Sequence, residues 1–433
     1  MMSGRALWTM LLILCPIVGV SFFQAVALYS EASASVSDAA ALASGLAPLD
    51  GVLVPTFGAF YVTVTLLFPF VAIRALGREK ETGTLRLLVQ LPYRTPTLIA
   101  AKAAAVAAAW LVALIPAVSA LVLWRALGGH LNATETLNLL LGHLLYGLLI
   151  GALALFAAAI AESAATAAIM TLAVTIGSWV LDFTLAGQPG LAEWAARLSL
   201  TQVLRPFEQG LFSFGLVLGA LATVLGLMTL AALWLHPGVP LRVKLKRSLA
   251  CIAVTGALVL VVAQTRITID VTEDRRNSFP AADQRALATL REPLVITVHL
   301  TPEDPRYVDL RRNVLGKLER IVPDVTIRLA GATRIFGRAE EDTYGEVEYS
   351  YGGRLDRSRS TSHREILPLL YGLAGVPAPT PIPGEDYPGY PLVTDAALAL
   401  PWFFGALPLL IALAWWRSRR APRISLPTAH QGG

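Results

Sequence analysis

The chain has 433 residues, of which 55% belong to the apolar set AVILMFWYC and only 15% are charged, against about 25% in soluble domains. Residues 266–395 hold 37 of its 65 charged residues, as 20 acids and 17 bases. The net charge of +5 does not indicate a nucleic-acid-binding protein, because the excess bases lie in short loops between apolar runs. The composition excludes a disordered chain, a collagen and a small disulfide scaffold. It predicts one soluble-like region within a chain suited to lipid.

A bilayer core of about 30 Å needs about 20 apolar helical residues. Eight runs meet or approach that length: 6–28, 52–76, 97–123, 137–160, 164–186, 215–235, 249–264 and 396–416. The first run could also be a signal peptide, but it lacks a small-residue cleavage site with a mature domain behind it. We therefore expect an α-helical polytopic membrane protein with about eight spans.

The Lys and Arg residues of the short loops predict the orientation. If the N-terminus is cytoplasmic, the cytoplasmic segments carry 15 bases and the short outer loops carry three, which are Arg125, Arg197 and Arg205. This bias places both termini in the cytoplasm. It also makes residues 266–395 extracytoplasmic.

No residue pattern indicates an enzyme. Cys15 and Cys251 both lie in apolar runs, so no disulfide framework is expected. The six histidines are scattered, and the acidic run 340–342 lacks the interleaved ligands and turn glycine of a calcium loop. We expect no catalytic site, no metal site and no cofactor on this chain. A membrane-embedded enzyme is the third function considered, after the two stated at the end of this section.

The segment 77–92, between the second and third runs, carries the most specific pattern. It reads Gly-Arg-Glu-Lys-Glu-Thr-Gly-Thr-Leu-Arg-Leu-Leu-Val-Gln-Leu-Pro. Thr82 or Thr84 can cap a helix, and Leu85 and Leu88 then share one face with the proline beyond them as a stop. The pattern predicts a short amphipathic helix at the inner membrane surface. From the pattern alone, a plain interfacial connection between two spans is the alternative.

The same segment resembles the coupling helix of type-2 ABC exporter permeases, in which a six-span domain carries it after the second span. Residues 1–236 fit this six-span plan, and residues 198–214 look like the family's outer re-entrant segment. Family members usually begin with a basic amphipathic helix, and only five residues precede the first run here, so either that arm is absent or the start lies upstream. The resemblance implies that an ATPase subunit docks on Arg78, Glu79, Glu81, Gly83, Thr84, Leu85, Leu88 and Pro92.

The ATPase itself is expected on another chain. The sequence contains no G-x-x-x-x-G-K-[ST] motif, which is the usual cradle for ATP phosphates. ATP and magnesium are therefore expected on a partner subunit. The resemblance also implies a second permease copy or homologue, the bilayer as environment, and a bacterial inner membrane as location.

The charged region is expected to form one extracytoplasmic α/β domain. Its patterns predict strands at 267–271, 294–300, 325–329 and 345–351, and helices at 281–291, 308–322 and 362–372. The second and third of these strands, with the helix between them, predict a parallel βαβ unit. A thioredoxin-like arrangement is the candidate. A linker with six prolines in residues 377–391 leads back to the last span.

This region has a resemblance of its own. Residues 270–279, Asp-Val-Thr-Glu-Asp-Arg-Arg-Asn-Ser-Phe, followed by 290–298, look like the auxiliary protein of gliding-motility-type ABC systems. Residues 349–354 and 366–375 fit the same family, whose outer region is normally much longer. The resemblance implies a permease fused to a shortened auxiliary subunit. The expected divisions are the permease 1–236, the basic loop and seventh span 237–265, the auxiliary domain 266–376, the linker 377–395, and the eighth span and basic tail 396–433.

Two ionisable residues are expected at membrane depth. His143 lies in the middle of the fourth run, and Asp182 lies near the outer end of the fifth. Such residues are costly in lipid and often functional, so both are candidates for a transport pathway. A hydrogen bond to a neighbouring helix, or a position nearer the interface, is the alternative.

The leading hypothesis is therefore the permease subunit of an ATP-driven ABC exporter. The alternative is a membrane anchor, or force-transmitting scaffold, that uses the same ATPase and moves no solute. The sequence does not name the cargo.

Overall fold

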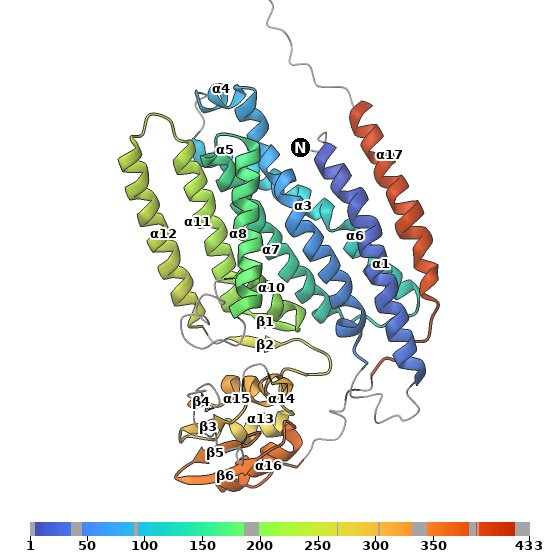
Figure 1. Cartoon of the computed structure of the whole chain (residues 1–433), viewed down its shortest axis with the longest axis vertical. Helices are drawn as coiled ribbons and strands as arrows, with labels where there is room; N and C mark the ends of the chain where they lie inside the picture. The colour runs from blue at the N-terminus through green and yellow to red at the C-terminus, as the bar shows by residue number, and fades with distance from the viewer. Residues whose placement is uncertain are drawn as a thin grey trace, which may run out of the picture.

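The structure is a computed structural model that describes residues 5–35, 46–90, 94–185, 199–265, 267–301, 304–330, 344–380, 387 and 389–420. Within these residues, eight helices are long and apolar enough to cross a membrane, as predicted. They are Arg5–Ser35, Leu49–Glu81, Thr95–Ala126, Ala133–Ile160, Ala164–Leu181, Phe214–Leu235, Leu241–Ala263 and Ala396–Arg420. They stand side by side as one bundle, with a smaller α/β domain at one end (Figure 1).

Three of these spans are composite. The second joins a π-helical turn, η1 (Leu49–Leu53), to α3 (Val54–Glu81). The third is divided into α5 (Thr95–Ala113) and α6 (Ile115–Ala126), and the break comes just before Pro116, which has no N–H to donate to the preceding turn. The last consists of η4 (Ala396–Ala399), η5 (Trp402–Ala406) and α17 (Leu407–Arg420).

Helix α3 lies at the centre of the bundle. It packs against α1 (Arg5–Ser35), α5, α7 (Ala133–Ile160) and α8 (Ala164–Leu185). Its aromatic side chains meet Trp110 of α5, with ring centroids 5.7 Å apart for Phe60 and 4.8 Å for Phe68. The whole tryptophan side chain is buried, and Gly147 of α7 provides the space for it. Large rings on one helix and glycines on the next allow the close approach on which helix packing in lipid depends.

Two spans lie at the periphery. α12 (Leu241–Ala263) packs on α11 (Phe214–Leu235), and α17 packs on α1. Only 11% of the most apolar 18-residue stretch of α12 is buried within the chain. The corresponding share is 61% for the span that contains α3. The seventh span starts earlier than the predicted 249–264, because the basic residues from Arg242 to Arg247 continue the helix instead of forming a loop.

A short segment at the α/β end of the bundle connects the two parts of the molecule. α10 (Thr201–Glu208) packs on α7 and α8, and it leads into the strand β1 (Leu211–Ser213). β1 pairs antiparallel with β2 (Thr268–Asp270). The strand predicted at residues 267–271 therefore forms, at 268–270, but it does not join the sheet of the α/β domain as expected. Ile267 and Ile269 are more than half exposed, so the segment is not half-buried as predicted.

The α/β domain has one four-stranded sheet in the order β4-β3-β5-β6. β3 (Leu294–Val298) pairs parallel with β4 (Val325–Leu329) and antiparallel with β5 (Val347–Tyr351), which pairs antiparallel with β6 (Arg354–Ser358). This order, a parallel βαβ unit followed by an antiparallel ββα unit, is compatible with the thioredoxin-like candidate.

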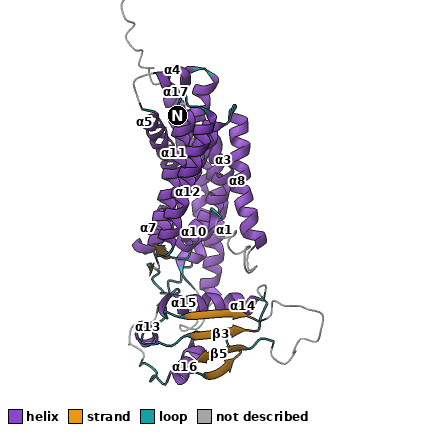
Figure 2. Cartoon of the chain, turned by 90° about the vertical axis from the view of Figure 1, so that its left-hand side faces the viewer, coloured by secondary structure: helices purple, strands orange, loops and turns teal. Residues whose placement is uncertain are grey.

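Four helical segments complete the α/β domain. They are α13 (Ala281–Leu287), α14 (Pro305–Leu310) with its π-helical continuation η2 (Arg311–Leu315), α15 (Gly316–Ile321) and α16 (His363–Ala374). α14 and α15 face the bundle (Figures 1 and 2). The other elements predicted for this domain are confirmed apart from their ends. β6 was not predicted because its sequence, Arg-Leu-Asp-Arg-Ser, is too polar to suggest a strand.

Candidate functional site

The segment that carries the predicted coupling residues forms a sharp corner at the end of the bundle farthest from the α/β domain (Figure 1). α3 ends at Glu81, and α4 (Thr84–Gln90) begins after a turn at Gly83, whose φ of 73° favours glycine. The Thr82 hydroxyl donates to the Arg78 carbonyl at 2.9 Å and shares a 2.7 Å hydrogen bond with Thr84. The Gly-Thr pair thus defines the corner, and the predicted short helix is confirmed.

One side of α4 rests on the bundle. Leu85 is buried and belongs to the main apolar core, and Leu88 is half-buried, as the periodicity predicted. On the other side Leu87 is 66% exposed. Arg78, Glu81 and the residues of the turn are exposed as well. The corner therefore presents charged groups and one large apolar side chain outward.

Two neighbouring side chains at the end of α3 point inward instead. Glu79 forms a close ion pair with Lys102 of α5, and both side chains are about three-quarters buried or more. Lys80 donates to the carbonyls of Ala158 and Ala159, at 3.1 and 3.0 Å, and also to that of Ala161. These are carbonyls of the last turn of α7, where a cation is electrostatically favourable. Glu79 and Lys80 fix the corner to α5 and α7.

The structure thus brings together seven of the eight predicted coupling residues, and the eighth, Pro92, lies outside the described residues. It also distinguishes Glu79, which is paired within the chain, from the exposed Glu81. Sequence reasoning missed the roles of Lys80 and Leu87. The only available signal for Leu87 was its place opposite the Leu85 face.

The two predicted pathway residues lie elsewhere. His143 is fully buried on α7, with its ring 4.9 Å from that of Phe57 and 5.9 Å from that of Phe60. Neither of its nitrogens has a hydrogen-bond partner within the described residues. Asp182 lies on α8, but its side chain is outside the described part.

A cavity of about 300 Å³ opens between α3, α8 and α10. Its lining combines apolar residues with Tyr61, Trp179, Arg205 and Glu208, and His143 does not contribute to it. Among the described residues, no three His, Cys, Asp or Glu side chains are placed to hold a metal ion.

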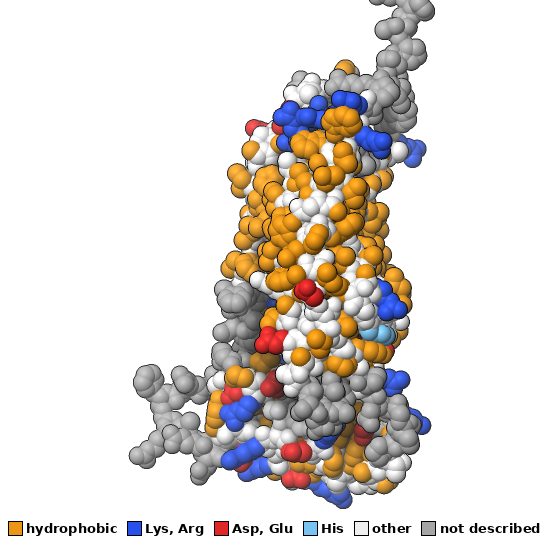
Figure 3. Space-filling view, turned by 90° about the vertical axis from the view of Figure 1, so that its right-hand side faces the viewer, with side chains coloured by type: hydrophobic (Ala, Val, Ile, Leu, Met, Phe, Trp, Pro, Cys, Tyr) orange, Lys and Arg blue, Asp and Glu red, His pale blue; other side chains and the backbone are white. Residues whose placement is uncertain are grey.

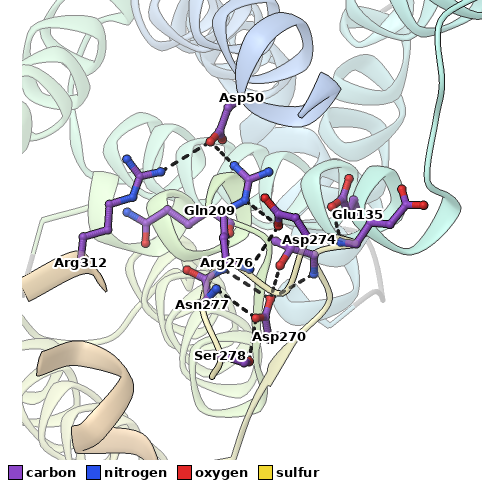
Figure 4. Close-up of polar contacts among 11 residues, drawn as sticks. Asp50, Glu135, Gln209, Asp270, Asp274, Arg276, Asn277, Ser278 and Arg312 are labelled. Carbon is purple, nitrogen blue, oxygen red and sulfur yellow. Dashed lines mark hydrogen bonds and ion pairs between the residues drawn. The ribbon is translucent and has the colours of Figure 1, made fainter. Parts of the chain in front are cut away.

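A polar junction joins the bundle to the α/β domain; we use this name for residues 268–278 and their contacts. At its centre, the Asp270 carboxylate accepts hydrogen bonds from three residues of the loop (Figure 4). The donors include the Thr272 hydroxyl at 2.6 Å, the backbone N–H of Asn277 at 3.1 Å and the Ser278 hydroxyl at 2.7 Å. One carboxylate therefore closes the whole loop. These contacts give Asp270, Thr272 and Ser278 a common structural role in the loop.

Glu273 in the same loop connects it to the bundle. Its carboxylate lies 2.8 Å from His130 Nε2 and accepts from the Tyr390 hydroxyl at 2.5 Å. The His130 and Tyr390 rings stack at 3.6 Å. Burial tends to raise the pKa of Glu273, but the hydrogen bonds from Tyr390 and His130 outweigh it and lower the pKa below its usual value.

Comparison with known proteins gives one match. The model of the family described as "ABC-2 family transporter protein" matches residues 1–262, which cover α1 through nearly all of α12. No curated protein and no solved structure matches the chain. The match covers the corner at α3 and α4, and it leaves out the α/β domain and the last span.

Proposed function

Because the chain belongs to the ABC-2 family of transporter proteins, and is thus a membrane permease component of an ABC transporter, we propose that it serves an ATP-driven exporter and couples to a separate ATPase through the corner of α3 and α4. The observation that carries the proposal is the two-sided character of this corner. Its inner side is fixed by Leu85, Glu79 and Lys80, while Glu81 and Leu87 are exposed. A rigidly held helix with a mixed apolar and charged outer side suits a protein partner that exerts force on it.

The charge distribution supports a cytoplasmic position for this corner. The ends of α4 and α17 lie at the same end of the bundle, and Lys and Arg side chains gather there above an apolar belt (Figures 1 and 3). Basic residues favour the cytoplasmic side of a membrane. In this orientation both termini are cytoplasmic and the α/β domain is extracytoplasmic, in a bacterial inner membrane.

The remaining assignments follow the two resemblances. The permease would pair with a second copy or a homologue, and ATP and magnesium would bind to the ATPase chains. The α/β domain would be the shortened auxiliary part of a gliding-motility-type system. His143 and Asp182 stay candidates for the transport pathway.

A force-transmitting scaffold is the second candidate function. The polar junction favours it, because Glu135 of α7 and Asp50 of η1 hold Glu273 and Arg276 in the segment that leads into the α/β domain. Stimulation of ATP hydrolysis by a candidate cargo in reconstituted vesicles would support transport. Hydrolysis that no cargo affects, together with movement of the α/β domain, would support the scaffold.

The docking proposal is tested by two substitutions on the outer side of the corner, one that reverses a charge and one that introduces a charge. Glu81→Arg and Leu87→Asp should each weaken co-purification with the ATPase subunit about tenfold or more, which corresponds to roughly 1.4 kcal/mol. Membrane insertion should be unchanged, since both side chains are exposed. Glu31→Arg, an exposed position on α1, is the control. Unchanged association in both corner variants would refute the proposal.

A further inference from the structure

Arg276 of the polar junction makes a buried charged contact with the bundle. Its guanidinium forms a close ion pair with Asp50 in η1, and its Nε donates to Asp274 at 3.0 Å (Figure 4). The side chain is only 13% exposed. Burial alone would lower the pKa of Arg276, but the carboxylates of Asp50 and Asp274 outweigh burial and raise it. The cation is therefore held in place by its two acidic neighbours.

Asp50 receives a second cation from the α/β domain proper. Arg312, in η2, reaches the same Asp50 oxygen at 3.5 Å, with both side chains substantially exposed. A single carboxylate at the end of the bundle therefore binds one arginine of the polar junction and one of the α/β domain. Figure 4 shows both guanidinium groups directed at it.

Asp50 belongs to the helix that carries the coupling corner. The span Leu49–Glu81 has 33 residues, or about 50 Å at 1.5 Å per residue, and it crosses the whole bundle. Its middle is buried among α1, α5, α7 and α8. A shift or tilt imposed at Glu81 therefore reaches Asp50 unless the helix bends at Pro69 in α3 or near Pro55, where the π-helical turn η1 joins α3.

The rest of the interface between the two parts permits relative movement. The apolar core of the α/β domain contains no bundle residue within the described part of the chain, so the two cores are separate. The contacts between them are hydrogen bonds and ion pairs, such as that from the Glu273 amide to buried Glu135 at 2.6 Å. Polar interfaces between domains generally allow motion, whereas fused apolar cores do not.

We propose that the ion pair of Asp50 and Arg276 passes movement of α3 to the α/β domain, and we call this pair the latch. Arg276 acts as a positioning residue, because it sets where the α/β domain lies relative to α3. The latch rests on the proposed function in one respect, since the ATPase at the α4 corner supplies the movement. The span Leu49–Glu81 thus contacts the proposed ATPase site at its Glu81 end and the polar junction at its Asp50 end. Arg312 adds a weaker, more exposed contact on the same carboxylate.

The experiment follows the distance between the two parts in the complete complex. Spin labels are attached at Ala133→Cys in α7 and Asp356→Cys in β6, both exposed positions, in a chain with Cys15→Ala and Cys251→Ala. The chain is reconstituted with its ATPase, and pulsed electron resonance compares the nucleotide-free state with the state trapped by ATP and vanadate. The distance should shift on trapping. Arg276→Gln should reduce the shift to less than half, and Arg276→Lys should largely restore it.

The controls separate this inference from the function on which it rests. Arg291→Gln removes the same charge from an exposed position of the α/β domain and should keep the full shift. Asp50→Asn tests the same contact from the bundle side, in case Arg276→Gln does not fold. ATPase association and ATP hydrolysis should persist in all these variants. If they persist and Arg276→Gln or Asp50→Asn shows the parental shift, or if the parent shows none, the latch is wrong. If the parent protein itself does not associate with the ATPase, the docking proposal is refuted instead.

Discussion

At the scale of single residues, neighbouring charges at the end of α3 have opposite roles. Glu79 and Lys80 are engaged by α5 and α7, whereas Arg78 and Glu81 point outward. The helical period explains the division, because successive residues are about 100° apart around the axis. Inward charges are tolerable here only because each has a partner. The geometry of the corner thus depends on the inward residues, and the proposed partner contact depends on the outward ones.

Lys80 gives the first prediction. Lys80→Ala removes the donor to three carbonyls at the end of α7, so the free energy of unfolding should fall by about 1–3 kcal/mol. Thermal unfolding in detergent, followed by size-exclusion chromatography, would detect the lower midpoint. Arg74→Ala, an exposed position on the same helix, is the control. Equal midpoints for Lys80→Ala and the parent protein would contradict the assigned role.

Glu273 gives a prediction on pH. Its folded pKa is lowered, so its ionised form stabilises the junction above the unfolded pKa of about 4.3, and this contribution is lost as the pH falls through the folded pKa. Hydrogen exchange of residues 268–278 should therefore show reduced protection below about pH 4.3. Glu273→Gln should flatten this dependence, and Glu319→Gln, which is exposed, should not. An identical pH profile in Glu273→Gln would count against the role of the carboxylate.

At the scale of elements, the packing of α3, α5 and α7 depends on glycines opposite aromatic rings. A Cβ at Gly147 would lie 1.9 Å from the Trp110 ring, whereas a Cβ at Gly58 would meet no atom within 4 Å. These two glycines lie on adjacent helices in the same bundle, Gly147 buried and Gly58 half-buried. Small residues at helix contacts are thus a requirement at one position and not at the other.

This contrast gives a matched pair of variants. Gly147→Ala should destabilise the bundle by about 1–3 kcal/mol, because the Trp110 ring must move out of a close-packed position. Gly58→Ala should be neutral or slightly stabilising, since alanine favours the helix. The thermal midpoints of the two purified variants measure the difference. A midpoint for Gly147→Ala that equals that of Gly58→Ala would disprove the packing argument.

At the scale of the whole molecule, two apolar cores are joined by a polar junction. The core of the α/β domain is made of residues from Phe279 to Leu373, and the main core of the bundle is made of residues 7–232 and 396–411. The chain leaves the bundle, folds the α/β domain, and returns to place α17 against α1. At the return, the Tyr29 hydroxyl donates to the Tyr390 carbonyl at 2.7 Å, which fixes the linker to the bundle.

The separation of the cores predicts that the α/β domain folds alone. A fragment of residues 279–376 contains the whole second core, so it should be soluble and unfold cooperatively in urea. Circular dichroism of the purified fragment tests this. As a control, Ile296→Asp places a charge in the buried centre of β3 and should abolish the transition. A fragment without a cooperative transition would show that the domain needs the bundle.

Much of the membrane part could be predicted from the sequence. Each span is a local property, since about 20 apolar residues must form a helix to satisfy the backbone in lipid. The corner of α3 and α4 was predictable because its pattern is also local. Gly83, with Leu85 and Leu88 beyond it, defines a turn and an amphipathic helix within a dozen residues. In the α/β domain, β-branched residues predicted the strand at β3, and polar–apolar alternation predicted the strand at β5.

Only the tertiary structure decided which groups meet across long separations in the sequence. The partner of β2 is a strand of the bundle, and the strand β6 depends on β5 beside it rather than on its own residues. Asp50 and Arg276 are 226 residues apart, and nothing local marks either as a partner. Hydrophobic length and period are recorded in consecutive residues, whereas ion pairs and strand neighbours exist only after the chain has brought distant segments together.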